Sequence, residues 1–414
     1  MIKTILSYLF ITISFCSFGQ DSVRIHKCDQ QNHSQEILLQ NPEISKVRIQ
    51  NERDIQNWLA NKTVTTQSVI SIPVVFHILY TTEEQNLSEP QILAQLEALN
   101  RDFRRNNPDT VLTPERFKSV ATDTEIEFCL AIQTPDGYLT NGIIRKETSV
   151  KKIGETDKYY QPTQGGSQIW DPEVYLNIWV CEINDTLLGY TYLPGEANAS
   201  FDGIVLNYQI CGNAFYISAP YNKGRTLAHE IGHWLNLEHP WGEEEGCGYD
   251  DKVSDTPLQE KPNYQCPNAI VISCNNAPNG DMHMNYMDYT FDQCQNSFTY
   301  GQKERMLATL NTNRKSLLSS IGCSLPDTTK LLEEVIDVFP NPTQTFLNIR
   351  FRLKESQNAA IIIFDITGKV IYHNNSIVEV ERVSIDFSEF ANGGYIVKVV
   401  TNDKNQIFKV LKTE

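Results

Sequence analysis

Three of the eight histidines of this 414-residue chain lie in one short stretch, HEIGHWLNLEH, at residues 229–239. His229 and His233 are four residues apart, so on a helix their side chains lie on one face and can both direct imidazole nitrogens at one metal ion. Glu230 is rotated to the side of that face, where its carboxylate can reach a metal-bound water rather than the metal. Zinc lowers the pKa of such a water to about 7 and polarises a substrate carbonyl, while the glutamate takes the proton and delivers it to the leaving amine. The spacing therefore predicts a zinc ion at which Glu230 drives the hydrolysis of a peptide bond.

The third candidate ligand, His239, lies six residues beyond His233 and cannot share the face of the same straight helix. The helix must end and the chain must turn at Asn236, where the zinc-helix pattern H-E-x-x-H-x-x-G-x-x-H has glycine. Asparagine is the commonest substitute for glycine in the left-handed conformation, so we predict that Asn236 keeps the turn at a cost below about 2 kcal/mol. A glutamate third ligand is the competing geometry, and Glu260 is available, but His239 makes it unnecessary. A chance match on a core helix is the other alternative, and the clustering of three histidines argues against it.

The chain before these histidines alternates between strand and helix patterns. Strong strand patterns occur at residues 71–80, 125–132, 174–183, 188–194 and 202–208. A helix is expected at 88–105, with Ser88 as its N-cap and Pro90 near its first turn. This order predicts an α+β catalytic domain in which a mixed, twisted sheet carries the active-site helix. The stretch LGYTYLP is expected to be the edge strand above the cleft, to which a substrate adds as a further strand.

The expected catalytic domain, residues 63–325, resembles the pappalysin family of metzincin metalloproteases. The resemblance rests on HEIGHWLNLEH, on NYMDY at 285–289 and on the spacing of the cysteines. It implies that Met287 forms a turn beneath the zinc and supports the histidines without binding the metal, and that Tyr289 stabilises the oxyanion of the tetrahedral intermediate. It also implies two disulfides in the loop segment after the histidines, Cys247 with Cys274 and Cys266 with Cys294.

The same resemblance implies a calcium site and a specificity pocket. The stretch DDKVSDTP resembles a calcium-binding loop, and an Asx-rich turn without an ion is the alternative. Its ligands would be Asp251, the carbonyl of Val253 and Thr256. Asp292 matches an acidic residue that lines the pocket for the residue after the scissile bond, and a plain turn residue is the alternative. Cleavage would then favour Arg or Lys at that position through a charge pair in a partly desolvated pocket.

Residues 1–19 have the pattern of a signal peptide, with a lysine, an apolar run and small residues before a cleavage site after Gly19. Cys16 suggests a lipoprotein anchor, but Phe15 is bulky where such sites need a small residue. No other apolar run is long enough to span a bilayer. We therefore expect a secreted or surface-attached protein, exported through the periplasm and without a transmembrane segment.

Residues 20–62 are polar, show no clear strand pattern and end in a stretch that could form a short helix, so we interpret them as a prosegment. Cys28 would keep the enzyme latent, because a thiolate is a strong zinc ligand and would displace the catalytic water. Asp29 is the alternative ligand. Activation would be a cut around Lys62, and Arg53 is a second candidate position.

The last part of the chain has an all-strand pattern. Residues 326–334 form a linker, and residues 335–414 are expected to form a small β-sandwich. This part resembles the C-terminal sorting domain of the type IX secretion system. The motifs that carry the resemblance are VFPNPT at 338–343, FDITGKVIY at 364–372 and GGYIVKV at 393–399. The resemblance implies the type IX secretion machinery as a partner, and an adhesive or carbohydrate-binding sandwich is the alternative.

Composition limits the partners and the disulfides. The formal net charge of −16 argues against nucleic acid or an anionic membrane as the main partner, because either would be repelled. Nine cysteines remain after the signal peptide, and an odd number leaves one unpaired, for which the upstream Cys28 is the candidate. Beyond the loop pairs, three connectivities are open to Cys129, Cys181, Cys211 and Cys323.

Two hypotheses from different classes follow. The first is a secreted zinc endopeptidase that is made as a latent zymogen and acts on proteins or peptides. The second is a catalytically silent surface-binding protein that uses a decayed metzincin domain as a scaffold. A decayed site usually loses its base first, whereas Glu230 and all three candidate ligands are present here. The sequence therefore favours the enzyme.

Overall fold

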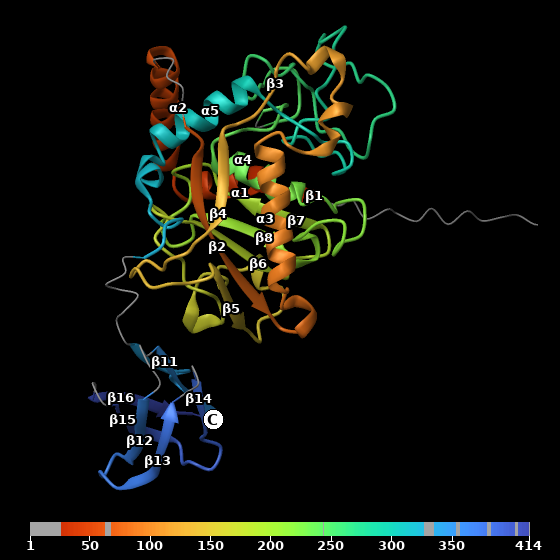
Figure 1. The fold of residues 1–414 in the computed structure, drawn as a ribbon. Coiled ribbons are helices and arrows are strands. Elements are labelled where there is room, and N and C mark those ends of the chain that lie inside the picture. The colour runs from red at the N-terminus through yellow and green to blue at the C-terminus, as the bar shows by residue number, and fades with distance from the viewer. Residues whose placement is uncertain are drawn as a thin grey trace, which may run out of the picture. The chain divides into compact units, whose positions relative to one another are not determined.

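The computed structural model describes residues 26–62, 68–242, 244–326, 335–352, 357–378, 382–401 and 405–413. The expected signal peptide and most of the expected linker lie outside these ranges. The chain divides into two compact units: one includes Asn141–Cys323 and the chain before Ile132, and the other comprises Ile132–Thr140 and the C-terminal part from Ser324. Figure 1 shows the elements of each unit.

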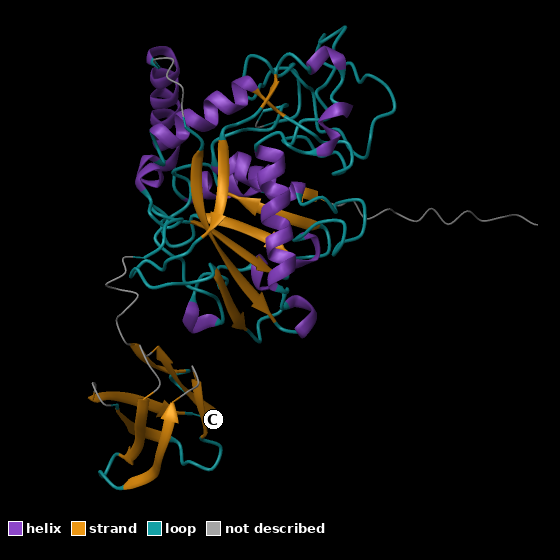
Figure 2. Cartoon of the chain, in the orientation of Figure 1, coloured by secondary structure: helices purple, strands orange, loops and turns teal. Residues whose placement is uncertain are grey.

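A seven-stranded mixed sheet forms the centre of the first unit (Figure 2). Its strands are β1 (His26–Cys28), β2 (Ile70–Tyr80), β4 (Ile126–Leu130), β5 (Ile143–Glu147), β6 (Leu176–Cys181), β7 (Leu187–Thr191) and β8 (Gly203–Asn207). The spatial order is β1-β7-β8-β6-β2-β4, and β5 also pairs with β2. The pairs of β2 with β4, β5 and β6, and of β6 with β8, are parallel, whereas β7 runs antiparallel to β8. The mixed sheet of the α+β prediction is therefore present, with β5 as a strand that the sequence patterns missed.

The main core lies on one face of this sheet, where the helices α3 (Glu89–Phe103), α4 (Arg225–Trp234) and α5 (Tyr300–Asn311) pack. The helix α3 begins as expected, with the Ser88 side chain accepting a hydrogen bond from the backbone of Gln91 and a proline in the first turn. The helix α5 begins with a capping box at Thr299. Alternate side chains of β2, β6 and β8 point into this core, so the strands hold α4 at a fixed height above the sheet.

Shorter elements complete the first unit. A two-stranded sheet pairs β3 (Ala121–Thr122) with β9 (Phe298–Thr299). Short 3₁₀ helices occur at Glu83–Gln85, Pro108–Leu112, Glu115–Phe117, Ile153–Glu155, Pro162–Gln164, Tyr208–Ile210 and Lys315–Ser319. Among the helices that the structure describes, none is long and apolar enough to cross a membrane.

The expected prosegment is more ordered than its sequence indicated, because it forms β1 and two helices, α1 (Gln30–Gln40) and α2 (Glu43–Asn61). The helix α2 lies against α5 (Figure 1), and its Ile55 is fully buried. The Glu52 carboxylate pairs with the buried Arg305 guanidinium at 2.5 Å, and the Arg305 Nε donates to the carbonyl of Asn236 at 2.8 Å. The prediction of no strand and one short helix was wrong, because these elements take their stability from the catalytic unit and not from their own residue pattern.

Three disulfides cross-link the described residues of the first unit. Cys247–Cys274 and Cys266–Cys294 interleave across the loop segment, and Cys129–Cys323 joins β4 to the chain after α5. Cys181 and Cys211 are reduced and buried in clusters on opposite faces of the sheet, so they cannot meet. The expectation that Cys28 alone is unpaired was therefore wrong.

The C-terminal unit is a small sandwich of two antiparallel sheets. One sheet has the order β10-β11-β14 and the other the order β13-β12-β15-β16. The strands are β10 (Val335–Phe339), β11 (Phe346–Arg352), β12 (Gln357–Asp365), β13 (Val370–Val378), β14 (Arg382–Asp386), β15 (Gly393–Val400) and β16 (Asn405–Lys412). Apolar side chains from both sheets form one core.

Candidate active site

The helix α4 carries His229 and His233 and ends at Trp234, so the chain can turn before it reaches the third candidate ligand, His239. Asn236 has a φ of +67°, its backbone N–H donates to the carbonyl of His233 at 2.8 Å, and the N–H of Leu237 donates to the carbonyl of Gly232 at 2.8 Å. This pair of bonds is a Schellman motif with asparagine in the left-handed position. The chain then turns back over the helix, and His239 joins the other two histidines.

We expect Asn236→Gly to leave the enzyme unchanged or slightly more stable, and Asn236→Val to destabilise it by about 1–2 kcal/mol, because a β-branched residue is strained in the left-handed conformation. The valine variant should also retain less zinc. Thermal unfolding and zinc content of the purified mature enzyme measure both effects. A valine variant with native stability and native zinc content would contradict this account of the turn.

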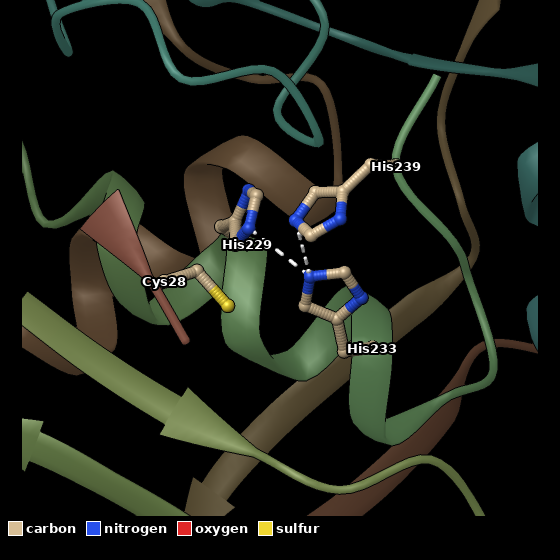
Figure 3. A group of neighbouring side chains, drawn as sticks. All are labelled: Cys28, His229, His233 and His239. Atoms are coloured by element: carbon tan, nitrogen blue, oxygen red, sulfur yellow. Dashed lines mark hydrogen bonds between the residues drawn. The ribbon is translucent and has the colours of Figure 1, made fainter. Parts of the chain in front are cut away.

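The three histidines converge through their Nε2 atoms (Figure 3). The Nε2 of His233 lies 3.1 Å from that of His229 and 3.0 Å from that of His239. The Nδ1 atoms of His229 and His233 face the carbonyls of Tyr286 and Leu237 at 2.7 Å, which assigns the proton to Nδ1 and leaves Nε2 as a lone pair. Burial lowers the pKa of His233 to about 4 and the pKa values of His229 and His239 well below their usual value, so all three rings are neutral at neutral pH.

These lone pairs fit a metal ion. Lone pairs that face one another at such short distances in a dry site repel, unless a cation lies between them. Neutral imidazoles with carbonyl partners on Nδ1 are the usual ligands of zinc. Glu260, the alternative third ligand, is exposed in the loop segment and is not part of the cluster.

A fourth atom that could hold a metal ion comes from Cys28 at the end of β1. Its Sγ lies within 4.8 Å of the three histidine nitrogens, and the strand pairing sets Cys28 opposite Gly189 of β7. Burial and the Glu230 carboxylate raise the pKa of the Cys28 thiol, an effect that a bound cation would oppose. The side chain of Asp29, the alternative ligand, instead accepts a hydrogen bond from Asn32 and does not join the cluster.

The candidate base, Glu230, is fully buried beside the thiol. Its Oε2 lies 3.4 Å from the Cys28 Sγ, and its Oε1 has no hydrogen-bond partner among the described residues. Burial raises the pKa of Glu230 to about 8. Gly189 makes room for this side chain, because a Cβ at that position would lie 3.3 Å from the Glu230 Cγ. Gly189 was not singled out from sequence, since its role depends on the strand that lies across α4.

The NYMDY stretch lies directly under α4. Met287 is fully buried, and a Cβ at Gly232 would collide with its sulfur. The glycine inside HEIGH is therefore the contact point of the helix with this turn. Tyr286, one residue earlier, supplies the carbonyl that receives His229.

Tyr289 lies next to the histidines of the candidate metal site. Its hydroxyl donates to the carbonyl of Cys28 at 3.2 Å, and its ring packs edge-on against those of His239 and Trp241. Trp241 stacks on His239 with the rings 4.5 Å apart and nearly parallel. Trp241 is a further site residue that sequence reasoning missed, and its position in EHPWG, two residues beyond His239, was the available signal.

Asp292 is fully buried near the start of α4. Its Oδ2 accepts from the backbone N–H of Lys223 at 2.7 Å and of Arg225 at 3.3 Å, whereas its Oδ1 is buried and unpaired among the described residues. The side chain of Lys27, from β1, approaches this region. Burial lowers the pKa of Lys27 to about 8, and Asp292 is the strongest of the carboxylates that oppose this shift.

The candidate calcium loop brings its three oxygens together. The Thr256 Oγ1 lies 2.7 and 2.8 Å from the two carboxylate oxygens of Asp251 and 2.7 Å from the carbonyl of Val253. A hydroxyl has one proton for these three acceptors. Burial raises the pKa of Asp251 to about 8.

Three converging histidines, two of them on a helix beside a sheet edge and next to a buried glutamate, are the site of a metalloendopeptidase. A family model described as pregnancy-associated plasma protein-A, a peptidase family, matches residues 161–311. The chain is also 43% identical to mature mirolysin of Tannerella forsythia, solved with a cleaved peptide, over 63% of this chain and 99% of that one, with a TM-score of 0.60. The chain belongs to the pappalysin family of metalloproteases.

Other relatives extend the match. Promirolysin of Tannerella forsythia, solved as a mutant, is 38% identical over 73% of this chain and 100% of that one, with a TM-score of 0.66. An extracellular metalloprotease of Arthroderma benhamiae is 30% identical over 57% of this chain and 76% of the relative. Residues 337–413 match the secretion system C-terminal sorting domain. The protein is thus an exported metalloprotease, secreted or held at the cell surface, with a type IX sorting domain.

Proposed function

We propose that this metalloprotease holds a catalytic zinc with His229, His233 and His239 and hydrolyses peptide bonds with Glu230 as the proton carrier. The convergence of the three Nε2 lone pairs beside the Glu230 carboxylate is the observation that carries the proposal. Bound zinc supplies Lewis-acid chemistry, activating water and polarising the scissile carbonyl. Glu230 accepts the proton of the attacking water and donates it to the leaving amine, and its dry surroundings favour such a transfer.

Tyr289 stabilises the developing oxyanion in this mechanism. In the latent chain its hydroxyl donates to the backbone carbonyl of Cys28, next to the three histidines. A substrate carbonyl in the same place would receive the same bond, which strengthens as negative charge forms on the oxygen. Met287 supports the histidines from below through its contact with Gly232.

We propose that residues 20–62 are a prosegment that keeps the enzyme latent, and that Cys28 closes the metal site as a ligand. Two contacts support this role: the thiol reaches the three histidines, and β1 covers the edge strand β7, to which a substrate would otherwise add. Activation at Lys62 is favoured over Arg53, because Lys62 follows the last residue of α2 whereas Arg53 lies inside the helix. Mass spectrometry of the mature N-terminus distinguishes these two sites.

We also propose that Asp292 selects Arg or Lys after the scissile bond, through its buried Oδ1, which has no hydrogen-bond partner among the residues that the structure describes. Digestion of a peptide library with the mature enzyme should give cuts before Arg and Lys. The Asp292→Asn variant should lose about tenfold to a hundredfold of the kcat/KM ratio between Arg and Leu at that position. The exposed Asp185→Asn is the matched control.

Zinc content of the Asp292→Asn variant must be measured with the digest, because Asp292 also caps the start of α4. A zinc-loaded Asp292→Asn enzyme with an unchanged cleavage preference would contradict the role of Asp292. A mature native enzyme that cuts no peptide in the library would contradict the peptidase mechanism itself.

Besides the catalytic zinc, we propose a structural calcium ion that is held by Asp251, the Val253 carbonyl and Thr256. Saturating calcium, in a buffer that keeps zinc bound, should raise the unfolding temperature of the mature enzyme by roughly 5–10 °C. Asp251→Ala should abolish this shift, whereas the exposed neighbour variant Asp250→Ala should preserve it. An unfolding temperature of the native enzyme that does not respond to calcium would argue for a plain turn.

A further inference from the structure

Two buried carboxylates of the catalytic unit, those of Glu196 and Glu238, both contact the prosegment helix α2. Only 2% and 4% of these residues are exposed, although glutamate is almost never fully buried unless its charge is paired. Glu196 lies in the turn that follows β7, and Glu238 directly precedes the third candidate ligand, His239. The two carboxylates are close enough to interact, because the charge of Glu238 adds to burial in raising the pKa of Glu196.

The cation that faces both carboxylates comes from the prosegment. Arg48 of α2 places its Nε 3.4 Å from the Glu196 Oε1 and its Nη2 3.8 Å from the Glu238 Oε1. Within the described part of the catalytic unit, Glu196 has no ion-pair partner, and Glu238 has Lys252 alone, at 2.5 Å. Release of the prosegment therefore leaves two neighbouring carboxylates with a single cation.

The catalytic unit itself holds these carboxylates in place. The backbone N–H of Leu193 donates to the Glu196 Oε2 at 3.0 Å, and the N–H of Glu196 donates back to the carbonyl of Leu193 at 3.0 Å. Lys252 fixes the Glu238 Oε1, whereas the Glu238 Oε2 is buried and has no hydrogen-bond partner among the described residues. Acceptors that are already positioned cost little to order when a ligand arrives, which favours binding.

The acidic pair, Glu196 and Glu238, and Asp292 lie on opposite sides of the candidate metal site. Asp292 accepts a hydrogen bond from the backbone N–H of Arg225, the first residue of α4. Glu238 instead follows the end of that helix. Since Asp292 is proposed to bind the residue after the scissile bond, the acidic pair faces the residues before that bond.

A cavity under α1 connects the acidic pair to the metal site. Its volume is about 110 Å³, and its lining on the side of the catalytic unit includes Leu193, Glu238 and His239. The strand β7, whose Gly189 pairs with Cys28, leads on to Leu193. A substrate that adds to β7 as a strand advances about 3.3 Å per residue, so the pair is within reach of a side chain about two to four residues before the scissile bond.

We propose that Glu196 and Glu238 form a second, acidic subsite of the mature enzyme, which binds an Arg or Lys side chain on the N-terminal side of the scissile bond. Arg48 holds this subsite in the latent chain. A guanidinium suits it better than an ammonium, because its planar fork of five donors can bridge two carboxylates. The inference rests on the proposed peptidase function and takes its orientation from Asp292.

The test uses the mature enzyme, released from the full-length chain, and fluorogenic peptides with one fixed residue after the scissile bond. A single position, about two to four residues before that bond, carries Arg, Lys, citrulline or Leu. Citrulline keeps the shape of arginine without its charge. At one of these positions we expect the native enzyme to cleave the Arg peptide with a kcat/KM about tenfold above that of the citrulline peptide.

The isosteric variant Glu196→Gln should lower this Arg-to-citrulline ratio about tenfold, and Glu238→Gln should lower it as well. The exposed Glu97→Gln on α3 is the matched control and should keep the native ratio. Zinc content is measured for Glu238→Gln, because this residue precedes His239. If a variant fails to fold, the citrulline comparison in the native enzyme still decides whether the subsite exists.

The outcomes separate this inference from the function on which it rests. A native enzyme that cleaves Arg and citrulline peptides equally well at every position before the bond would overturn the subsite. A native ratio that persists in zinc-loaded Glu196→Gln and Glu238→Gln enzymes would overturn the role of the acidic pair. A mature enzyme that cleaves none of the peptides would instead refute the proposed peptidase function.

Discussion

Glu230→Ala should lower the kcat/KM of the mature enzyme for peptide hydrolysis by between about a hundredfold and ten-thousandfold, the range expected when a general acid–base group is removed. Glu230 is the carboxylate beside the three converging histidines, and its Oε1 is buried and unpaired in the described part of the structure. The fold thus keeps a proton acceptor next to the position where water must attack. Kinetics with a fluorogenic peptide measure the loss directly.

Three controls show whether this loss belongs to the chemical step. The Glu230→Ala protein should keep its zinc, because the carboxylate is not among the histidine ligands. Its unfolding temperature should not fall, since the substitution removes a buried group that lacks full hydrogen bonding. The exposed Glu97→Ala on α3 should retain native activity. A zinc-loaded Glu230→Ala enzyme with more than a tenth of native activity would refute the mechanism.

Cys28→Ala should make the proenzyme activate about tenfold to a hundredfold faster, because the prosegment loses its ligand to the metal, a change worth roughly 1.4–2.8 kcal/mol. The Cys28 Sγ also lies 3.4 Å from the Glu230 Oε2. The rate of activation without added protease, followed by gel and by activity, measures the effect.

The matched control for this experiment is Cys211→Ala, which removes another buried and reduced thiol. Cys211 lies in the main hydrophobic core and not in the metal cluster, so its loss should leave latency unchanged. If the Cys28→Ala and Cys211→Ala proenzymes both activate at the native rate, Cys28 has no role in latency. The prosegment would then act only through β1 and its helices.

The sequence by itself predicted the parts of the site that depend on local geometry. A spacing of four residues is enough to place His229 and His233 on one helix face, and the αL preference of asparagine is enough to interpret Asn236. Five of the seven strands of the central sheet were predictable for the same reason, since alternation and apolar runs are local properties. The resemblance to a known family extended this reading to NYMDY, whose own residue types are also consistent with ordinary core packing.

The tertiary structure alone decided what the distant segments contribute. The strand β1 has only three residues and no strand pattern of its own, and it exists because β7 offers an unpaired edge. The space that Gly189 leaves for Glu230 and the contact of Lys27 with Gln295 both arise between residues far apart in the chain. Such contacts depend on the path of the whole chain and on burial, which determine which charges must be paired. The residue pattern of one segment contains neither the path of the whole chain nor the burial of its side chains.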